Sequence, residues 1–412
     1  MTSEALWNMG MESVKALESE FGVLASARTE AYGCIFGRDS ALTTLALLHA
    51  YTKSSDPYLL ALVERSLRTL ANLQGRFENI ESGEAPGKII HEYRPNKHEH
   101  LTQLAEDPWY LYPEGEMRNY DSVDATPLFL IAVHEYAKVG DKHFINTLMP
   151  AVRAGLNWLC SFDGFITYDF PMTRTFGGLR VQSWMDSTES LFYEHSSERP
   201  PYPIAPVEVQ AYAYSALVRW GESAKAARLR ELFTIAFVMA DAEQVALAFA
   251  IDGKGKRLES ARSNMGHVLW AAVAGESILD TLYIAPLVRR LMQPDLFVEG
   301  AGLRTLSSNS THFDPQSYHN GSIWPHDTAM VAEGFQNFGF DKEAQLLRDA
   351  LVTAYSYFKT PVELYTYEDE LKPYEPMSGH RACQIQAWSA ASLLAILGDA
   401  IPNASAPQPA RT

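Results

Sequence analysis

One helical hairpin is visible in the stretch SIWPHDTAMVAEGFQNFGFDKEAQLLRDALVTAYSYF, which covers residues 322–358. Its apolar residues recur at the spacing of one helix face, which is typical of amphipathic α-helices. The pattern predicts helices over 322–338 and 341–358, joined by Gly339-Phe340-Asp341. Because so short a connection makes antiparallel neighbours, the two helices are predicted to pack side by side.

The same periodicity recurs along the whole chain. It predicts roughly twelve helices, with these approximate limits: 3–19, 39–53, 56–75, 122–139, 142–160, 206–220, 222–239, 264–273, 276–291, 322–338, 341–358 and 382–399. Clean period-two alternation between hairpin turns is absent from the sequence, so we expect little sheet, confined to loops. The predicted fold class is all-α.

The connections between these helices alternate between short and long. The short ones include 52–56, 138–141, 220–222 and 339–341, and the long ones are 20–38, 76–121, 161–205, 240–263, 292–321 and 359–381. Strict alternation places every long loop at the same end of the assembly. Long loops gathered on one face of a rigid scaffold are where binding and catalysis usually occur.

This alternation fits a closed toroid of helical hairpins with an inner and an outer ring. The inner helices are predicted to begin near Asp39, Ser122, Pro206, Asn264, Ser322 and Ala382 and to point their N-termini at one pocket. Each start carries a polar or aromatic cluster, at 37–40, 120–126, 206–210, 263–267, 319–327 and 379–384. Helix capping also explains any single cluster. We expect one domain over 1–400 and a flexible, Pro-rich tail over 401–412.

Composition limits the classes of partner and compartment. Among 412 residues, 34 are basic and 50 acidic, which gives a net charge of −16. Such a charge repels phosphate backbones and anionic lipids, so neither nucleic acid nor a membrane is an expected partner. Three scattered cysteines, no signal-peptide pattern and no long apolar segment predict a cytoplasmic protein. Oligomeric state is not indicated.

No cofactor is predicted. A Gly-rich phosphate loop between strand and helix is absent from the sequence. The pairs His98/His100 and His319/His326 lack a recognised ligand spacing, so we expect no metal site.

The segment Gln182–Ser190 places Asp186 directly behind Trp184 and Met185. An apolar neighbourhood disfavours the charged carboxylate, and a carboxylic acid that stays protonated can act as a general acid. The alternative is a helix N-cap, since Glu189 follows three positions later in a pattern like a capping box. The motif alone leaves both interpretations open.

Aromatic residues accompany the polar clusters and indicate a neutral polyhydroxylated ligand. Aromatic rings cover the apolar face of a sugar, and carboxylates and amides bind its hydroxyls. The candidate platforms are Trp109, Tyr120, Trp184, Trp324, Tyr365 and Trp388, although Trp388 lies within a helical pattern that favours the core. A second carboxylate is available at Glu363, before Leu364 and Tyr365, whereas 368–370 is typical of a solvated acidic run.

In order along the chain, segments 37–39, 120–126, 182–186, 263–267, 302–307, 318–327, 363–365 and 386–388 resemble the glucosidase domain of glycogen debranching enzymes, the amylo-α-1,6-glucosidase type. The resemblance implies an (α/α)6 toroid and an inverting mechanism. It implies that Asp186 is the general acid, that Glu363 is the general base, and that Arg38 and Asp39 bind hydroxyls of the terminal glucose. The predicted substrate-binding set also contains Tyr120, Asp121, Asp124, Gln182, Trp184, His319, Asn320, Trp324, His326 and Tyr365.

The first predicted helix begins almost at Met1, without the β-rich and glucanotransferase regions of debranching enzymes. We therefore expect a small α-glucoside as substrate at least as much as an α-1,6-linked branch. The alternative is a hydrolase of a compact solute such as glucosylglycerate. A non-catalytic sugar-binding protein would not need both Asp186 and Glu363, so the presence of both argues against it.

Overall fold

The computed structural model describes residues 1–240, 244–377, 379 and 381–398. The predicted tail 401–412, the end of the predicted domain at 399–400, and His380 of one predicted cluster lie outside the described residues. The helices are α1 (Ser3–Ala16), α2 (Gly37–Ser54), α3 (Pro57–Asn72), α4 (Glu99–Thr102), α5 (Ala125–Tyr136), α6 (Lys142–Cys160), α7 (Val207–Arg219), α8 (Ser223–Phe237), α9 (His267–Trp270), α10 (Thr281–Leu291), α11 (Pro325–Gln336), α12 (Asp341–Phe358) and α13 (Ala387–Leu397), with 3-10 helices η1 (Thr188–Ser190) and η2 (Ser263–Gly266).

Short antiparallel strands lie between these helices. The pairs are β1 (Glu18–Ser19) with β2 (Gly22–Val23), β7 (Val238–Ala240) with β8 (Val245–Leu247), β11 (Phe297–Val298) with β12 (Gly302–Leu303), and β13 (Tyr365–Tyr367) with β14 (Leu371–Pro373). Two sheets have three strands, in the orders β3 (Ile35–Phe36), β4 (Glu92–Arg94), β5 (Met117–Asn119) and β10 (Arg257–Leu258), β9 (Ala250–Ile251), β6 (Ala205–Pro206). The prediction of a mostly helical protein with little sheet is confirmed.

Several predicted helix limits were wrong, including those of the helices expected over 3–19, 122–139, 222–239, 264–273, 276–291 and 382–399. Helix α8 ends at Phe237 instead of 239, since Val238 pairs with Leu247 in the β7–β8 hairpin. The predicted helix 264–273 is two short pieces, η2 and α9. Helix α13 begins at Ala387 rather than Ala382.

The late start of α13 follows from the hydrogen bonds of the preceding backbone. The Cys383 amide donates to the Glu363 carboxylate, and the Gln386 amide donates to the Pro361 carbonyl. Since these N–H groups are already bound to residues 361–363, the segment stays extended until Ala387.

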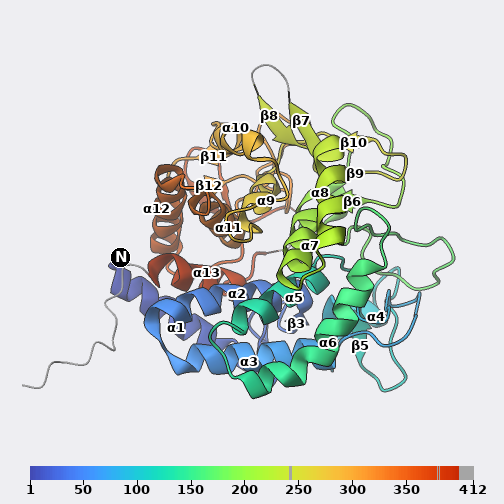
Figure 1. The fold of residues 1–412 in the computed structure, drawn as a ribbon. Coiled ribbons are helices and arrows are strands. Elements are labelled where there is room, and N and C mark those ends of the chain that lie inside the picture. The colour runs from blue at the N-terminus through green and yellow to red at the C-terminus, as the bar shows by residue number, and fades with distance from the viewer. Residues whose placement is uncertain (241–243, 378, 380, 399–412) are drawn as a thin grey trace, which may run out of the picture.

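One set of helices contacts its neighbours in a closed cycle (Figure 1): α2 packs on α5, α5 on α7, α7 on α9, α9 on α11, α11 on α13, and α13 on α2. A second set packs against the first from outside, with α1 on α13, α3 on α2, α6 on α5, α8 on α7 and α12 on α11. The sequences of the helices explain why some lie in the inner cycle and others outside it. Most residues of α5 and α13 are buried, as expected for a surrounded helix, whereas α3 and α6 bury a single apolar face.

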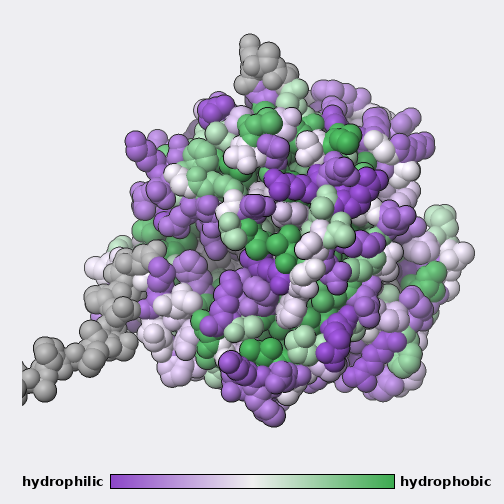
Figure 2. All heavy atoms as spheres, viewed as in Figure 1, coloured by the Kyte–Doolittle hydropathy of each residue, from purple (hydrophilic) through white to green (hydrophobic). Residues whose placement is uncertain are grey.

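Hydrophilic residues cover much of the molecular face in Figure 2, with hydrophobic residues scattered between them. Within the described part of the chain, none of the helices combines the length and the apolar character needed to cross a bilayer.

Two glycines allow the backbones around α9 and α11 to approach closely. A Cβ atom at Gly334 would lie 2.7 Å from the backbone nitrogen of Trp270, and one at Gly266 would lie 2.6 Å from a methyl carbon of Val331. A side chain at either position therefore pushes apart two helices of the inner cycle.

We expect Gly334→Ala to lower the free energy of unfolding by about 1–3 kcal/mol, because the new methyl group meets backbone that cannot rotate away. The matched control is Gly155→Ala in α6, whose Cβ would come no closer than 3.4 Å to Leu130. It should be neutral or stabilising by up to about 1 kcal/mol, since alanine is the better helix former. Urea unfolding compares the two. Equal midpoints would show that the close approach is dispensable.

Candidate active site

A small cavity of about 60 Å³ lies at the N-terminal ends of α2, α11 and α13. It is lined by Tyr32, Phe36, Arg38, Asp39, Trp184, Asp186, Tyr318, His319, Trp324, Glu363, Gln386 and Trp388. The predicted acid Asp186 and the predicted base Glu363 thus reach one pocket from loops far apart in sequence. Asp39 adds a third carboxyl group from the first turn of α2.

Arg38 connects this pocket to the neighbouring helix. Its Nη2 donates to Asp186 Oδ2 at 2.6 Å, and its Nη1 donates to Asp124 Oδ2 at 3.0 Å. Asp124 immediately precedes α5, and its other carboxylate oxygen accepts a hydrogen bond from Ser122. The buried guanidinium therefore ties together the starts of two inner helices and the loop that carries Asp186.

Asp186 does not cap a helix. Ser187 holds the N-cap position of η1, and no side chain forms a capping hydrogen bond there. Burial raises the pKa of Asp186 above its usual value; Arg38 opposes this effect and Asp124 adds to it. The environment thus favours the protonated form that proton donation requires.

Glu363 is held at both carboxylate oxygens. Oε2 accepts from the Cys383 amide at 2.7 Å, and Oε1 accepts a hydrogen bond from the Tyr318 hydroxyl. Burial raises the pKa of Glu363 to about 7, against the lowering effect of the bonds from Tyr318 and Cys383. A group with this pKa is partly ionised near neutral pH and can accept a proton from water.

Asp39 is similarly perturbed. Burial raises its pKa to about 7, although the positive charge of Arg38 lowers it. Its Oδ2 accepts a hydrogen bond of 3.3 Å from Gln386 Nε2, so the starts of α2 and α13 meet at this side chain.

Aromatic rings form much of the remaining wall. The Trp184 ring lies edge-on to Trp324 and Trp388, with centroids 4.9 and 5.5 Å apart, and His319 stacks on Trp324 at 5.3 Å. The expectation that Trp388 belongs to the core was incomplete, because this buried residue also lines the pocket from the first turn of α13. Such rings can cover the apolar face of a sugar.

Several predicted substrate-binding residues do not line the cavity: Tyr120, Asp121, Asp124, Gln182, Asn320, His326 and Tyr365. Four of them bond to the surrounding loops. Tyr120 donates to the Leu73 carbonyl, Tyr365 to the Ala301 carbonyl and Gln182 to the Asp169 carbonyl, while Asp121 forms a buried ion pair with Arg174 at 2.8 Å.

Asn320 and the fully buried Arg262 hold the loop of the predicted acid. Arg262 donates to the carbonyls of His319 and Ser190 and to Asn320 Oδ1, at 2.8–2.9 Å. Asn320 in turn donates to the carbonyl of Glu189 at 2.9 Å. Arg262 therefore links the backbone that follows Asp186, at Glu189 and Ser190, to the segment 319–320, a role that its sequence neighbourhood did not suggest.

The prediction also missed pocket residues, namely Tyr32, Phe36, Tyr318 and Gln386. Tyr318 and Gln386 stand in the segments 318–327 and 386–388 that carried the family resemblance, so a signal was present. Tyr32 had none beyond its position in the long loop 20–38.

Buried carboxyl groups set among aromatic rings, on a scaffold of mostly helical hairpins, are the arrangement expected of a glycoside hydrolase. Residues 213–379 match a family model described as "Mannosylglycerate hydrolase MGH1-like glycoside hydrolase domain". Over these residues the chain is similar to a glycoside hydrolase domain. No curated protein sequence matches the chain.

Solved structures share the fold across almost the whole chain. The GH63 mannosylglycerate hydrolase of Thermus thermophilus, in complex with Tris, is 15% identical with a TM-score of 0.62, over 95% of this chain and 99% of that one. The same hydrolase with Tris and D-glycerate gives 15% identity and a TM-score of 0.61, over 95% and 99%. A glycosidase variant in complex with glucose is 14% identical with a TM-score of 0.62, over 97% and 98%.

The pH dependence of activity should respond to Tyr318. Its hydrogen bond stabilises charged Glu363 and lowers the pKa of that carboxyl group. Tyr318→Phe should therefore raise the pKa and move the acidic limb of kcat/KM, which we expect near pH 7, to higher pH. The control is Tyr374→Phe, since Tyr374 packs against Tyr318 with ring centroids 5.8 Å apart. If the acidic limb lay at the same pH in the wild type and in Tyr318→Phe, it would not report the ionisation of Glu363.

Proposed function

We propose that this chain is an inverting hydrolase that releases glucose from a small α-glucoside, with Asp186 as general acid and Glu363 as general base. The observation that carries the proposal is the meeting of the partly buried Asp186 carboxyl group and the buried Glu363 carboxyl group in one pocket, each with a hydrogen-bond partner. Arg38 bonds to Asp186, and Tyr318 and the Cys383 amide bond to Glu363.

In the proposed reaction, Asp186 gives its proton to the glycosidic oxygen as the bond to the anomeric carbon breaks, and the aglycone leaves as an alcohol. Glu363 removes a proton from a water molecule, whose oxygen attacks the anomeric carbon from the opposite face. Glucose leaves with the β configuration. Burial shifts the pKa of Asp186 toward the protonated form that this step needs, and Glu363, with a pKa of about 7, is partly ionised near neutral pH.

The closed cycle of contacts from α2 to α13 supports an (α/α)6 toroid with the pocket at the N-terminal ends of its inner helices. Such a scaffold suits the proposal because helix starts bring side chains to one place from many parts of the sequence. Arg38 and Asp39 come from α2, Trp324 precedes α11, and Gln386 precedes α13.

The dimensions of the pocket favour removal of one terminal sugar. Its volume of about 60 Å³ is far below the roughly 300–1,000 Å³ of ordinary ligand pockets. A small neutral carbohydrate is therefore favoured over a polymer that must thread through the site, and Arg38 and Asp39 are proposed to bind the hydroxyls of its terminal glucose.

A compact solute such as glucosylglycerate is the second candidate. The family description names a mannosylglycerate hydrolase, and a structural relative was solved with D-glycerate. Comparing glucose release from glucosylglycerate with that from isomaltose distinguishes the two candidates directly.

Stereochemistry tests the mechanism. If water attacks from the face opposite Asp186, the carboxyl groups of acid and base should stand roughly 6.5–9.5 Å apart, against about 5–5.5 Å for a retaining pair. Proton NMR of the first product from an α-glucoside should show β-glucose. Initial release of α-glucose would exclude inversion.

Substitutions separate the two roles. Glu363→Gln should reduce kcat for all α-glucosides by at least about a hundredfold, since the pair loses the group that activates water. Asp186→Asn should do so for poor leaving groups while largely sparing binding. Glu368→Gln is the matched control, because Glu368 is exposed beside Lys372 in the same loop. A Glu363→Gln enzyme as active as this control would remove Glu363 from the mechanism.

A further inference from the structure

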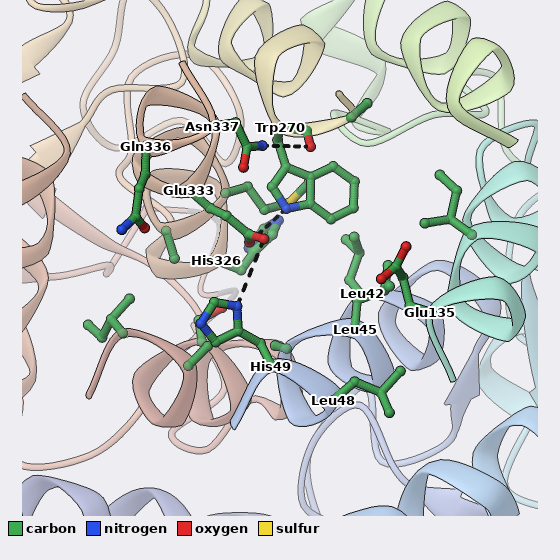
Figure 3. Close-up of a pocket in the computed structure, with 18 of the residues that line it drawn as sticks. Leu42, Leu45, Leu48, His49, Glu135, Trp270, His326, Glu333, Gln336 and Asn337 are labelled. Atoms are coloured by element: carbon green, nitrogen blue, oxygen red, sulfur yellow. Dashed lines mark hydrogen bonds and ion pairs between the residues drawn. The ribbon is translucent and has the colours of Figure 1, made fainter. Parts of the chain in front are cut away.

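A second and larger cavity, of about 300 Å³, opens toward the C-terminal ends of the inner helices (Figure 3). Most of its wall comes from the middle and later turns of α2, α5, α7, α11 and α13 and from the end of α9, with His326 and Trp388 added from the first turns of α11 and α13. The catalytic pocket lies at the opposite ends of these helices. The proposed hydrolysis uses none of the residues around the mouth of this second cavity, which we term the rear cavity.

His326 and Trp388 line the rear cavity at its inner end. Their rings stack with centroids 3.8 Å apart, and Trp388 also lines the catalytic pocket, so the stack separates the two spaces. His326 is only 2% exposed, yet neither of its ring nitrogens has a hydrogen-bond partner among the described residues. Because buried polar atoms are nearly always satisfied, these two nitrogens indicate a ligand.

The charge state of His326 limits what this ligand can be. Burial holds the pKa of His326 well below its usual range, with smaller contributions from His267 and Arg38. A neutral imidazole offers one donor and one acceptor. A hydroxyl group can bond to either ring nitrogen, whereas a carboxylate can bond only to the protonated one and an ammonium group only to the other.

The walls of the rear cavity have an apolar side and a polar side. Leu42 and Leu45 approach it from α2, and the indole of Trp270 points into the space (Figure 3). On the polar side, Glu333 accepts from Trp270 Nε1 at 2.9 Å and lies 4.0 Å from His49 Nδ1. A pyranose has the same division, with C–H groups on its faces and hydroxyls around its edge.

Glu135 is the second acidic residue at the mouth of the rear cavity, and neighbouring basic side chains neutralise its charge. Glu135 forms ion pairs with Arg219 at 3.0 Å and with Lys138 at 2.5 Å. It therefore offers no unpaired negative charge to an organic cation. The rim therefore carries both acidic and basic side chains, Glu333 and Glu135 beside Lys138, Arg219 and Arg348, and no excess of negative charge that would select an organic cation.

We propose that the rear cavity is a second carbohydrate-binding site that takes one neutral monosaccharide, with a hydroxyl bonded to His326 and a ring face against Leu42, Leu45 and Trp270. This inference goes beyond the proposed hydrolysis and does not depend on the roles of Asp186 and Glu363. It also places the bound sugar against the side of the His326–Trp388 stack that faces away from the catalytic pocket.

Binding stoichiometry of the full chain tests the site, with glucose as the probe in isothermal titration calorimetry. The wild type should bind two equivalents. Ala46→Phe, which fills the rear cavity from a half-buried position on α2, should bind one. Ala61→Phe is the matched control, because Ala61 is exposed on α3, and it should bind two. His326→Phe keeps a stacked ring but loses both nitrogens, and it should weaken one of the two sites by at least tenfold.

The outcomes separate this inference from the proposed function. If the wild type bound one equivalent of glucose and Ala46→Phe bound none, the result would support the rear site. It would also show that glucose does not bind in the catalytic pocket. One equivalent in both would overturn the rear site and leave the catalytic proposal standing. Binding of tetramethylammonium that Ala46→Phe abolishes, without a second glucose, would also overturn the assignment, since it would show that the cavity takes a cation.

Discussion

The candidate active site depends on a buried arginine that is shared by two acidic side chains. Arg38 is almost inaccessible, and Asp186 and Asp124 occupy its two terminal nitrogens. Removing charges from water is costly, and their mutual attraction and hydrogen bonds must offset that cost, so loss of one partner typically destabilises a protein by about 3–5 kcal/mol. Here one cation fixes the start of α2, the start of α5 and the loop of the proposed acid. Scaffold and chemistry are thus held by one set of bonds.

The same burial explains why the pocket can hold a proton near neutral pH. Asp39, Asp186 and Glu363 all line it, and burial raises the pKa of each. Arg38 counters the effect at Asp39 and Asp186, whereas Glu363 relies on Tyr318 and the Cys383 amide. Because one positive charge cannot neutralise three carboxylates, the pocket favours a state in which at least one remains protonated. An acid and a base can therefore coexist in a single cavity.

The sequence pattern predicted correctly those features that depend on neighbouring residues, such as the limits of some helices. Helices α6 and α12 follow the apolar periodicity to their limits, and 182–186 and 363 were recognised as the carboxyl-bearing segments. The start of α13 was missed because the amides before it bond to 361–363, which no local pattern reveals. Contacts between distant segments likewise decide which of two tyrosines binds the Glu363 carboxylate. Tyr365, two positions after Glu363, bonds away from the pocket to Ala301, while Tyr318, 45 positions before it, holds its carboxylate.

The start of α11 contributes side chains to both cavities. Trp324 precedes α11 and lines the catalytic pocket, whereas His326, two positions later, lines the rear cavity against the reverse side of Trp388. Trp324 is the N-cap residue and has extended backbone, whereas His326 lies in the first turn of the helix, so their side chains leave the backbone in different directions. The sequence segment that contains Trp324 and His326 therefore predicts that its helix belongs to the inner cycle of helices. It does not predict which cavity each side chain lines. The shared stack makes the floor of the catalytic pocket part of the wall of a second site.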